Sequence, residues 1–288
     1  MRVRRRGGTG SIRPGSCERP GSCERPETGW VAAGVVLAWP AVRDQYTQAE
    51  LDELVAATAP RAGWDFSRIR AVSAPTPWEY TEVVARYLRP SDEVLDVGTG
   101  DGVRFARLAG KFRHGLGIDP DPEMVRLAVQ RPGPENLEFR LGDARLEDVA
   151  STFPVIINRH ANLDWLAIAA HLEPGGYFIT QQVGERNMAC VRAALGQPDE
   201  GPVIDAGRIA DAGLRLVAYG EFDVEYLVRD IESLVFWLSA LDALHADLDG
   251  SAAVASAAAL NEILSGHVDE RGFVTNEHRY LVVAQARW

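Results

Sequence analysis

The sequence predicts an α/β protein built on a doubly wound, mostly parallel sheet, and two observations carry that prediction. From residue 93 to residue 184, short apolar strands alternate with helices through short connections. Such alternation brings the strands together in one parallel sheet. The first strand, at 93–97, runs into a loop with glycine at Gly98, Gly100 and Gly102, a composition typical of a ligand-binding turn before a helix.

The other elements of this region follow from the same rhythm of apolar and polar residues. We expect strands at 114–119, 137–144, 154–160 and 177–184, and helices at 103–112, 121–131 and 163–176. The helix at 163–176 is expected to end at Gly175 and Gly176, because glycine takes the positive φ that ends many helices.

The C-terminal third continues the sheet and adds helices. We expect a long strand or a bent pair of strands at 214–228, an amphipathic helix at 231–244, an alanine-rich helix at about 252–265 and a buried strand at 278–288. No linker separates these pieces. Residues 91–288 are therefore expected to form one domain, with an insertion at about 229–276.

The first ninety residues divide into a tail and a cap. Residues 1–29 are expected to be a disordered basic tail, because Gly, Pro and Ser are frequent there and seven Arg stand against two Glu in residues 1–26. A basic contact arm is the alternative. Residues 30–90 are expected to form a helical cap with helices at 47–60 and 78–90. The apolar stretch at 30–39 is too short to span a bilayer, so no membrane contact is expected.

The net charge and the cysteine content indicate which partners and which cellular compartment to expect. The chain of 288 residues has a net charge of −11, and the basic tail makes the remainder more acidic still. An acidic surface repels phosphate backbones, so nucleic acid is not an expected partner. The three cysteines, Cys17, Cys23 and Cys190, have no metal-binding spacing and no disulfide pattern. We therefore expect no metal and a cytoplasmic location.

The glycine loop separates two kinds of cofactor. Dinucleotide sites use G-x-G-x-x-G, but Val103 stands where the third glycine would be, and the pattern here is G-x-G-x-G. Asp96 and Asp101 flank the turn and would repel a pyrophosphate. A cofactor that ends in an ammonium group suits these acids.

This loop resembles motif I of the class I S-adenosylmethionine-dependent methyltransferases, of a bacterial small-molecule type. Other landmarks occur in the family's order: "GLGID" ending in Asp119, "LGDA" with Asp143, and "LEPGGYFIT". The resemblance implies a Rossmann-like, seven-stranded sheet whose last strand is antiparallel, and S-adenosylmethionine as cofactor. It implies that Asp119 takes the ribose hydroxyls and that Asp143 bonds the adenine amino group. The expected cofactor-binding residues are Asp96, Gly98, Thr99, Gly100, Gly102, Asp119, Pro120, Asp143, Ala144 and Arg159.

Two departures from the family concern the fourth strand. Pro154 stands where many relatives have an Asp, and "NRHA" at 158–161 replaces the Asn-Pro-Pro-Tyr-like sequence of enzymes that methylate base amines. Arg159, grouped above with the cofactor residues, could instead bind an acceptor carboxylate or pair with a buried acid. The sequence leaves these alternatives open.

Two histidines are the expected catalytic residues. Ligands of doubly wound sheets bind at the carboxyl ends of the strands. His160 ends the fourth strand, and His278 begins the last one, which starts at the same edge if it is antiparallel. Either could act as general base or orient the acceptor, and both could instead be packing residues.

The expected function is methyl transfer from S-adenosylmethionine to oxygen or nitrogen of a small-molecule acceptor. Aromatic residues of the cap, Trp64, Phe66, Trp78 and Tyr80, favour an aromatic or apolar acceptor, in a monomer or homodimer; alternatively, these residues only pack the cap onto the core. One alternative is the same fold with another use of the cofactor. A second is a cofactor-binding module without catalysis, and a third is an NAD-linked oxidoreductase, which Val103 and Asp96 disfavour.

Overall fold

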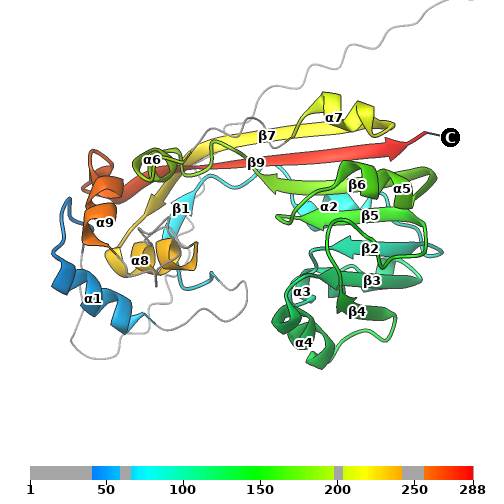
Figure 1. Ribbon diagram of the computed structural model, residues 1–288, viewed down its shortest axis with the longest axis horizontal. Coiled ribbons are helices and arrows are strands. Elements are labelled where there is room, and N and C mark those ends of the chain that lie inside the picture. Colours follow the sequence, from blue (N-terminus) through cyan, green and yellow to red (C-terminus); the bar gives the residue numbers. More distant parts are fainter. Residues whose placement is uncertain (1–40, 59–65, 198–203, 242–255, 288) are drawn as a thin grey trace, which may run out of the picture. The chain divides into compact units, whose positions relative to one another are not determined.

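The computed structural model describes residues 41–58, 66–197, 204–241 and 256–287, so the tail expected at 1–29 lies outside the described residues. A nine-stranded sheet has the order β1-β7-β9-β6-β5-β2-β3-β4, with β8 paired to β9 (Figure 1). The strands are β1 (Ala71–Ser73), β2 (Glu93–Val97), β3 (His114–Asp119), β4 (Leu137–Leu141), β5 (Phe153–Arg159), β6 (Leu172–Val183), β7 (Leu214–Val228), β8 (Val268–Asp269) and β9 (Gly272–Ala286).

The strand directions confirm the predicted fold class. Strands β2 to β6 pair in parallel, and β9 lies antiparallel between β6 and β7. The carboxyl ends of the five parallel strands therefore meet at one edge of the sheet. Seven strands were expected. The two additional ones, β1 and β8, have three and two residues and extend the edges of β7 and β9.

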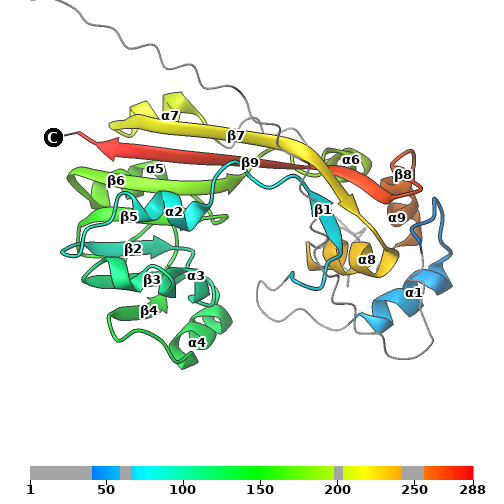
Figure 2. The ribbon, with the colours of Figure 1, turned by 180° about the vertical axis from the view of Figure 1, so that it is seen from behind.

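Helices cover both faces of the sheet. They are α1 (Gln48–Ala57), α2 (Tyr80–Ala85), α3 (Val103–Ala106), α4 (Pro122–Gln130), α5 (Trp165–His171), α6 (Ala189–Ala194), α7 (Ala206–Asp211), α8 (Ile231–Ala240) and α9 (Ala257–Leu264), with a 3-10 turn at Ala109–Lys111. Side chains of α2 and α3 pack on one face of the sheet. In Figure 2, α2 lies in front of the sheet, on this face. Side chains of α5 and α7 pack on the other face.

A further core forms where β7 and β9 run past the end of β6. Val183 is the last residue of β6 and pairs with Arg279, whereas β9 begins seven residues earlier, at Gly272. Buried side chains of α1, α8 and α9 pack there around Val228 and Phe273. Asp230 caps α8 by accepting from the Ser233 backbone at 2.9 Å. Within the described residues, no helix has both the length and the apolar character needed to cross a membrane.

The predicted boundary of the helix at 163–176 is wrong. Helix α5 ends at His171, and Leu172 already pairs with Phe153 of β5. The register of β5 and β6 shifts at this point, and Pro154 lies at the shift, a place in a sheet where proline is tolerated. Gly175 has the expected positive φ, +76°, but this conformation turns the chain within β6 rather than ending a helix.

We predict that Leu238→Ala lowers the free energy of unfolding by about 2–5 kcal/mol, because Leu238 of α8 is fully buried and its truncation leaves a cavity. Leu241→Ala is the control, since Leu241 is 43% exposed. It should change stability by less than about 0.5 kcal/mol. Urea unfolding followed by circular dichroism measures both, and equal effects would contradict the packing described for α8.

Candidate functional site

The glycine loop is held against the end of the neighbouring strand. The backbone nitrogens of Gly98 and Thr99 both donate to the Ile118 carbonyl, at 2.8 and 2.9 Å. Gly98, Gly100 and Gly102 have φ of +76°, +59° and +73°, values that favour glycine. A Cβ on Gly98 would stand 2.2 Å from that of Ala161. The loop after β5 therefore packs directly on the glycine loop.

Asp119 ties this loop to the carboxyl end of β3. Its side chain is 7% exposed. One carboxylate oxygen accepts from the Gly100 nitrogen at 2.8 Å, and the other accepts from the Asp121 nitrogen at 3.0 Å. Each oxygen keeps a lone pair after these bonds. Asp119 can therefore hold the loop and still accept hydrogen bonds from two hydroxyl groups. The exposed Pro120 follows it.

Asp96 and Thr99 are buried polar residues at the mouth of the same loop. The pKa of Asp96 is raised to about 7, mainly by burial; the nearby Thr99 hydroxyl opposes this rise, and the Asp119 charge adds to it. The Thr99 hydroxyl oxygen is itself buried, and no described residue reaches full hydrogen-bonding geometry with it. A cation next to Asp96 would favour its ionised form. Among the described residues, the Asp96 carboxyl group and the Thr99 hydroxyl group thus lack a full set of hydrogen-bond partners.

A pocket of about 270 Å³ lies beside the end of β4. Its lining includes Ile118, Pro120, Gly142, Asp143 and Leu146. The Asp143 carboxylate accepts from the backbone and guanidinium of Arg145, the latter at 2.8 Å, and these bonds lower its pKa. Asp143 is therefore ionised and can accept a further donor from a ligand. Ala144 follows it and packs partly on the core.

A chain of hydrogen bonds fixes the state of His160 at the end of β5. The Trp78 indole nitrogen donates to Gln181 Oε1 at 2.8 Å, and Gln181 Nε2 lies 2.9 Å from His160 Nε2. An indole nitrogen only donates, so the Gln181 amide nitrogen must face the imidazole. His160 Nε2 therefore accepts, and the ring proton lies on Nδ1.

The electrostatic surroundings keep His160 neutral. Desolvation of the ring and the charges of Arg159, Arg279 and Arg104 lower the pKa of His160 well below its usual value. The residue is nevertheless exposed at the surface, and its φ is +58°. His160 thus presents a neutral ring whose Nδ1–H, a donor, has no partner among the described residues.

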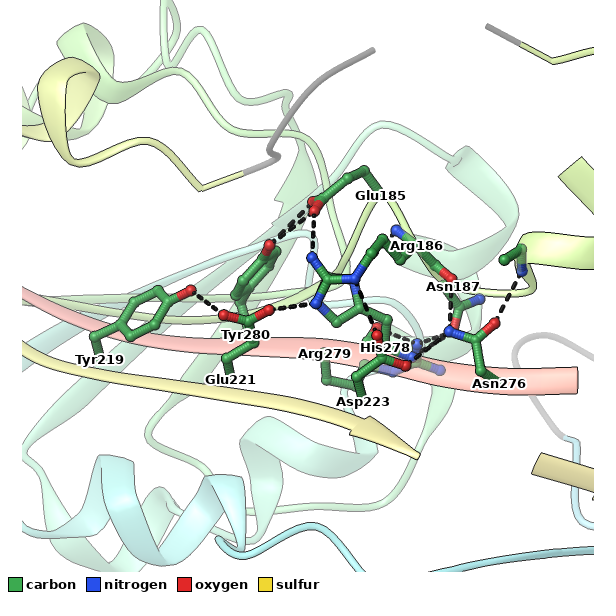
Figure 3. A network of polar contacts seen from close by, with 11 residues as sticks. Glu185, Arg186, Asn187, Tyr219, Glu221, Asp223, Asn276, His278, Arg279 and Tyr280 are labelled. Carbon is green, nitrogen blue, oxygen red and sulfur yellow. Dashed lines mark hydrogen bonds and ion pairs between the residues drawn. The ribbon is translucent and has the colours of Figure 1, made fainter. Parts of the chain in front are cut away.

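His278 lies on the opposite face of the sheet, in the network of Figure 3. Its side chain is fully buried. Nδ1 accepts from the Arg186 backbone at 3.2 Å, and Nε2 lies 3.2 Å from a Glu221 oxygen. Arg186 also contacts Asp223. Both ring nitrogens are therefore engaged within the protein, and the structure does not bring His278 together with His160. The catalytic role of His278 stays a prediction.

The polar residues on β6 were not among the residues expected from the sequence. Gln181 orients His160, and Gln182 donates to the Asn158 side chain at 2.6 Å and to the Ala161 carbonyl at 3.2 Å, which shapes the loop after β5. Two adjacent glutamines in an otherwise apolar strand are an unusual signal, because buried polar groups need partners.

These residues fit a cofactor with an ammonium group, a ribose and an adenine. Asp96 offers an acid with a raised pKa, and Thr99 a hydroxyl without a partner within the described structure. Asp119 retains acceptor capacity at the edge, and the pocket at Asp143 lies beyond it. Their order across β2, β3 and β4 follows the order of the three chemical groups in S-adenosylmethionine.

Comparisons with known proteins agree with this geometry. A family model described as a methyltransferase domain matches residues 94–176. The ribosomal protein L11 methyltransferase of Thermus thermophilus is 30% identical over 148 residues, 48% of this chain and 56% of that protein. The trans-aconitate 2-methyltransferase of Deinococcus radiodurans is 30% identical over 122 residues, 39% of this chain and 46% of that protein. The chain thus spans about half the length of these curated relatives.

Solved structures show the same fold. A functionally unknown protein from Deinococcus radiodurans superposes with a TM-score of 0.54 at 20% identity, covering 75% of this chain and 90% of that one. A putative methyltransferase from Bacillus halodurans gives 0.52 at 16% identity, covering 73% and 99%. Residues 94–176 are thus similar to a methyltransferase domain, and the sheet around them has the Rossmann-like fold of these structures, which is the fold of S-adenosylmethionine-dependent methyltransferases.

We predict that Gly98→Ala weakens S-adenosylhomocysteine binding at least tenfold and lowers the free energy of unfolding by roughly 1–3 kcal/mol. The new methyl group would meet Ala161, and the positive φ strains alanine. Gly110→Ala is the control, because a Cβ added at Gly110 would meet no neighbouring atom within 4 Å. Calorimetry and urea unfolding measure the two effects. Equal behaviour of both variants would contradict the close packing at Gly98.

We predict that S-adenosylhomocysteine binds roughly tenfold more tightly at pH 8 than at pH 6. A carboxyl group with a pKa of about 7 is about one-tenth ionised at pH 6 and about nine-tenths at pH 8, and the ligand's ammonium group prefers the ionised form. Because the folded pKa exceeds the ordinary value, the stability of the ligand-free protein should fall as pH rises from about 4 to 7. Calorimetric titrations test the affinity, and Asp96→Asn should abolish its pH dependence.

Proposed function

We propose that the protein transfers a methyl group from S-adenosylmethionine to oxygen or nitrogen of a small-molecule acceptor. The observation that carries this proposal is the Asp119 carboxylate, which holds the glycine loop through Gly100 and keeps lone pairs at the strand edge. The relatives' names support methyl transfer and differ in acceptor, from a ribosomal protein to trans-aconitate. Of these two kinds of acceptor, a protein and a small molecule, we propose the small molecule.

The residues on β2, β3 and β4 would hold the cofactor in three places. Asp96 would bind the ammonium group, with Thr99 and the loop backbone beside it. Asp119 would accept from both ribose hydroxyls, and Asp143 from the adenine amino group. Bound there, the cofactor supplies an activated methyl group on a sulfonium, so the protein's own task is alignment and exclusion of water.

His160 would orient the acceptor rather than remove its proton. Its Nε2 lone pair is occupied by Gln181, and its Nδ1–H is the group left to contact a ligand. An acceptor oxygen that takes this hydrogen bond keeps a second lone pair for the methyl group and would be held by a donor fixed through Gln181 and Trp78. A base is not required where the acceptor oxygen is already ionised, as in a carboxylate or a phenolate. Such an acceptor fits the neutral, donating form of His160 best.

We predict that Asp119→Ala abolishes methyl transfer and weakens S-adenosylmethionine binding at least tenfold, because it removes the acceptors for both ribose hydroxyls and releases Gly100. The measurement uses methyl-labelled cofactor with a metabolite extract and compares S-adenosylhomocysteine formed with labelled product. A ratio of one supports methyl transfer. Another use of the cofactor breaks this ratio, and a non-catalytic module binds the cofactor without labelled product.

Glu93→Gln is the matched control for an acid on the same sheet. Glu93 lies at the opposite end of β2 and pairs with Arg113 at the surface, so its loss should leave cofactor affinity within about twofold, since exposed pairs contribute little. An equal loss of affinity in both variants would contradict the assignment of Asp119.

A further inference from the structure

Arg159 is a positively charged residue at the carboxyl end of β5, and among the described residues it has no counterion. Its Nε atom is buried, and it has no hydrogen-bond partner among the residues that the structure describes. Within the same residues, no carboxylate forms an ion pair with it. The sequence left open that Arg159 pairs with a buried acid, and the described structure provides no such acid.

The neighbouring positive charges would make the binding of an anion at Arg159 more favourable. Desolvation, together with the neighbouring positive charges of Arg104 and Arg279, lowers the pKa of Arg159 to about 10. It remains charged at neutral pH. Arg279 has its own partner, Glu277, at 3.0 Å. Glu79 is the nearby acid, and its carboxylate is engaged with Thr81 and the Glu82 backbone.

Beside Arg159 lie the polar side chain of Gln181 and the aromatic side chains of Trp78 and Phe222. Arg159 pairs with Gln181 across β5 and β6, and Gln181 pairs with Leu281 of β9, so the three side chains lie on one face. Trp78 covers the next position, where a Cβ on Gly220 would stand 3.0 Å from the indole. The indole also packs edge-on against Phe222.

We propose that the methyl acceptor is an organic acid whose carboxylate binds Arg159 and whose body lies along Trp78 and His160. This inference rests on the proposed function and names the substrate class of that site. A guanidinium binds a carboxylate with charge-assisted, often bidentate hydrogen bonds, and a buried Nε without a partner is the donor such a bond would satisfy.

The cofactor's own carboxylate is the other source of this chemistry. The geometry favours the acceptor, because Gln181, the polar neighbour of Arg159 across β5 and β6, lies on the side of β5 that faces β9, away from β2 and its Asp96. The second positive charge, Arg279, lies two strands from β5 in that direction, about 10 Å at ordinary strand spacing. The two positive charges, Arg159 and Arg279, therefore lie on the side of the sheet edge where we place the acceptor.

The test compares acids with their neutral amides on the protein loaded with S-adenosylhomocysteine. The probes are benzoate, 4-hydroxybenzoate, cinnamate and succinate, each beside its own amide, titrated by calorimetry. At least one acid should bind tenfold or more tightly than its amide. Arg159→Met should remove this preference and leave S-adenosylhomocysteine affinity within about twofold. Arg113→Met, which removes an exposed arginine paired with Glu93, should change neither.

Two results would overturn the proposal. In one, no acid binds more tightly than its amide to the wild-type complex. In the other, Arg159→Met lowers S-adenosylhomocysteine affinity tenfold and keeps the preference for acids, which would assign Arg159 to the cofactor's carboxylate. If Arg159→Met unfolds, Arg159→Lys keeps the charge without the bidentate geometry and should weaken acid binding severalfold. Failure of the wild type to bind S-adenosylhomocysteine would instead reject the proposed function itself.

Discussion

The two backbone hydrogen bonds accepted by Asp119 are the interaction on which the rest of the site depends. A buried carboxylate is costly unless donors compensate its lost hydration, and Gly100 and Asp121 supply them. The loop can present Gly100 in this way because its glycines tolerate positive φ. The acid and the loop therefore determine each other's position. Asp96 and Thr99 then stand at the mouth of the loop with incomplete partners.

The sheet and the places of Asp119 and Asp143 at its edge were predictable from the sequence because their signals are local. Each parallel strand is a short apolar run, and strand–helix alternation places the strand ends, with Asp119 and Asp143, at one edge. The ends of elements were less predictable. The helix before β6 stops at His171 because Leu172 pairs with Phe153, and β1 and β8 are too short to carry a pattern of their own.

The contacts of Trp78, Gln181 and His160 could not be predicted from the sequence because they are long-range. The bond from Trp78 to Gln181 spans 103 residues, and the contact from Gln181 to His160 spans 21. Both depend on the register of β5 and β6 and on where the cap places an indole. The proton position on His160 follows only once this chain of contacts is known.

Strands β7 and β9 contribute side chains to two hydrophobic cores at once, and this limits how their length can change during evolution. Side chains alternate between faces, so a slip of one residue in their pairing would exchange His278 with Arg279 and also turn Phe273 out of its core. Changes of length within these strands are therefore barred by both cores together. The connection between them, with α8 and α9, is free of that restriction on register, so evolutionary changes of length are expected to concentrate in this connection while the paired strands keep their length.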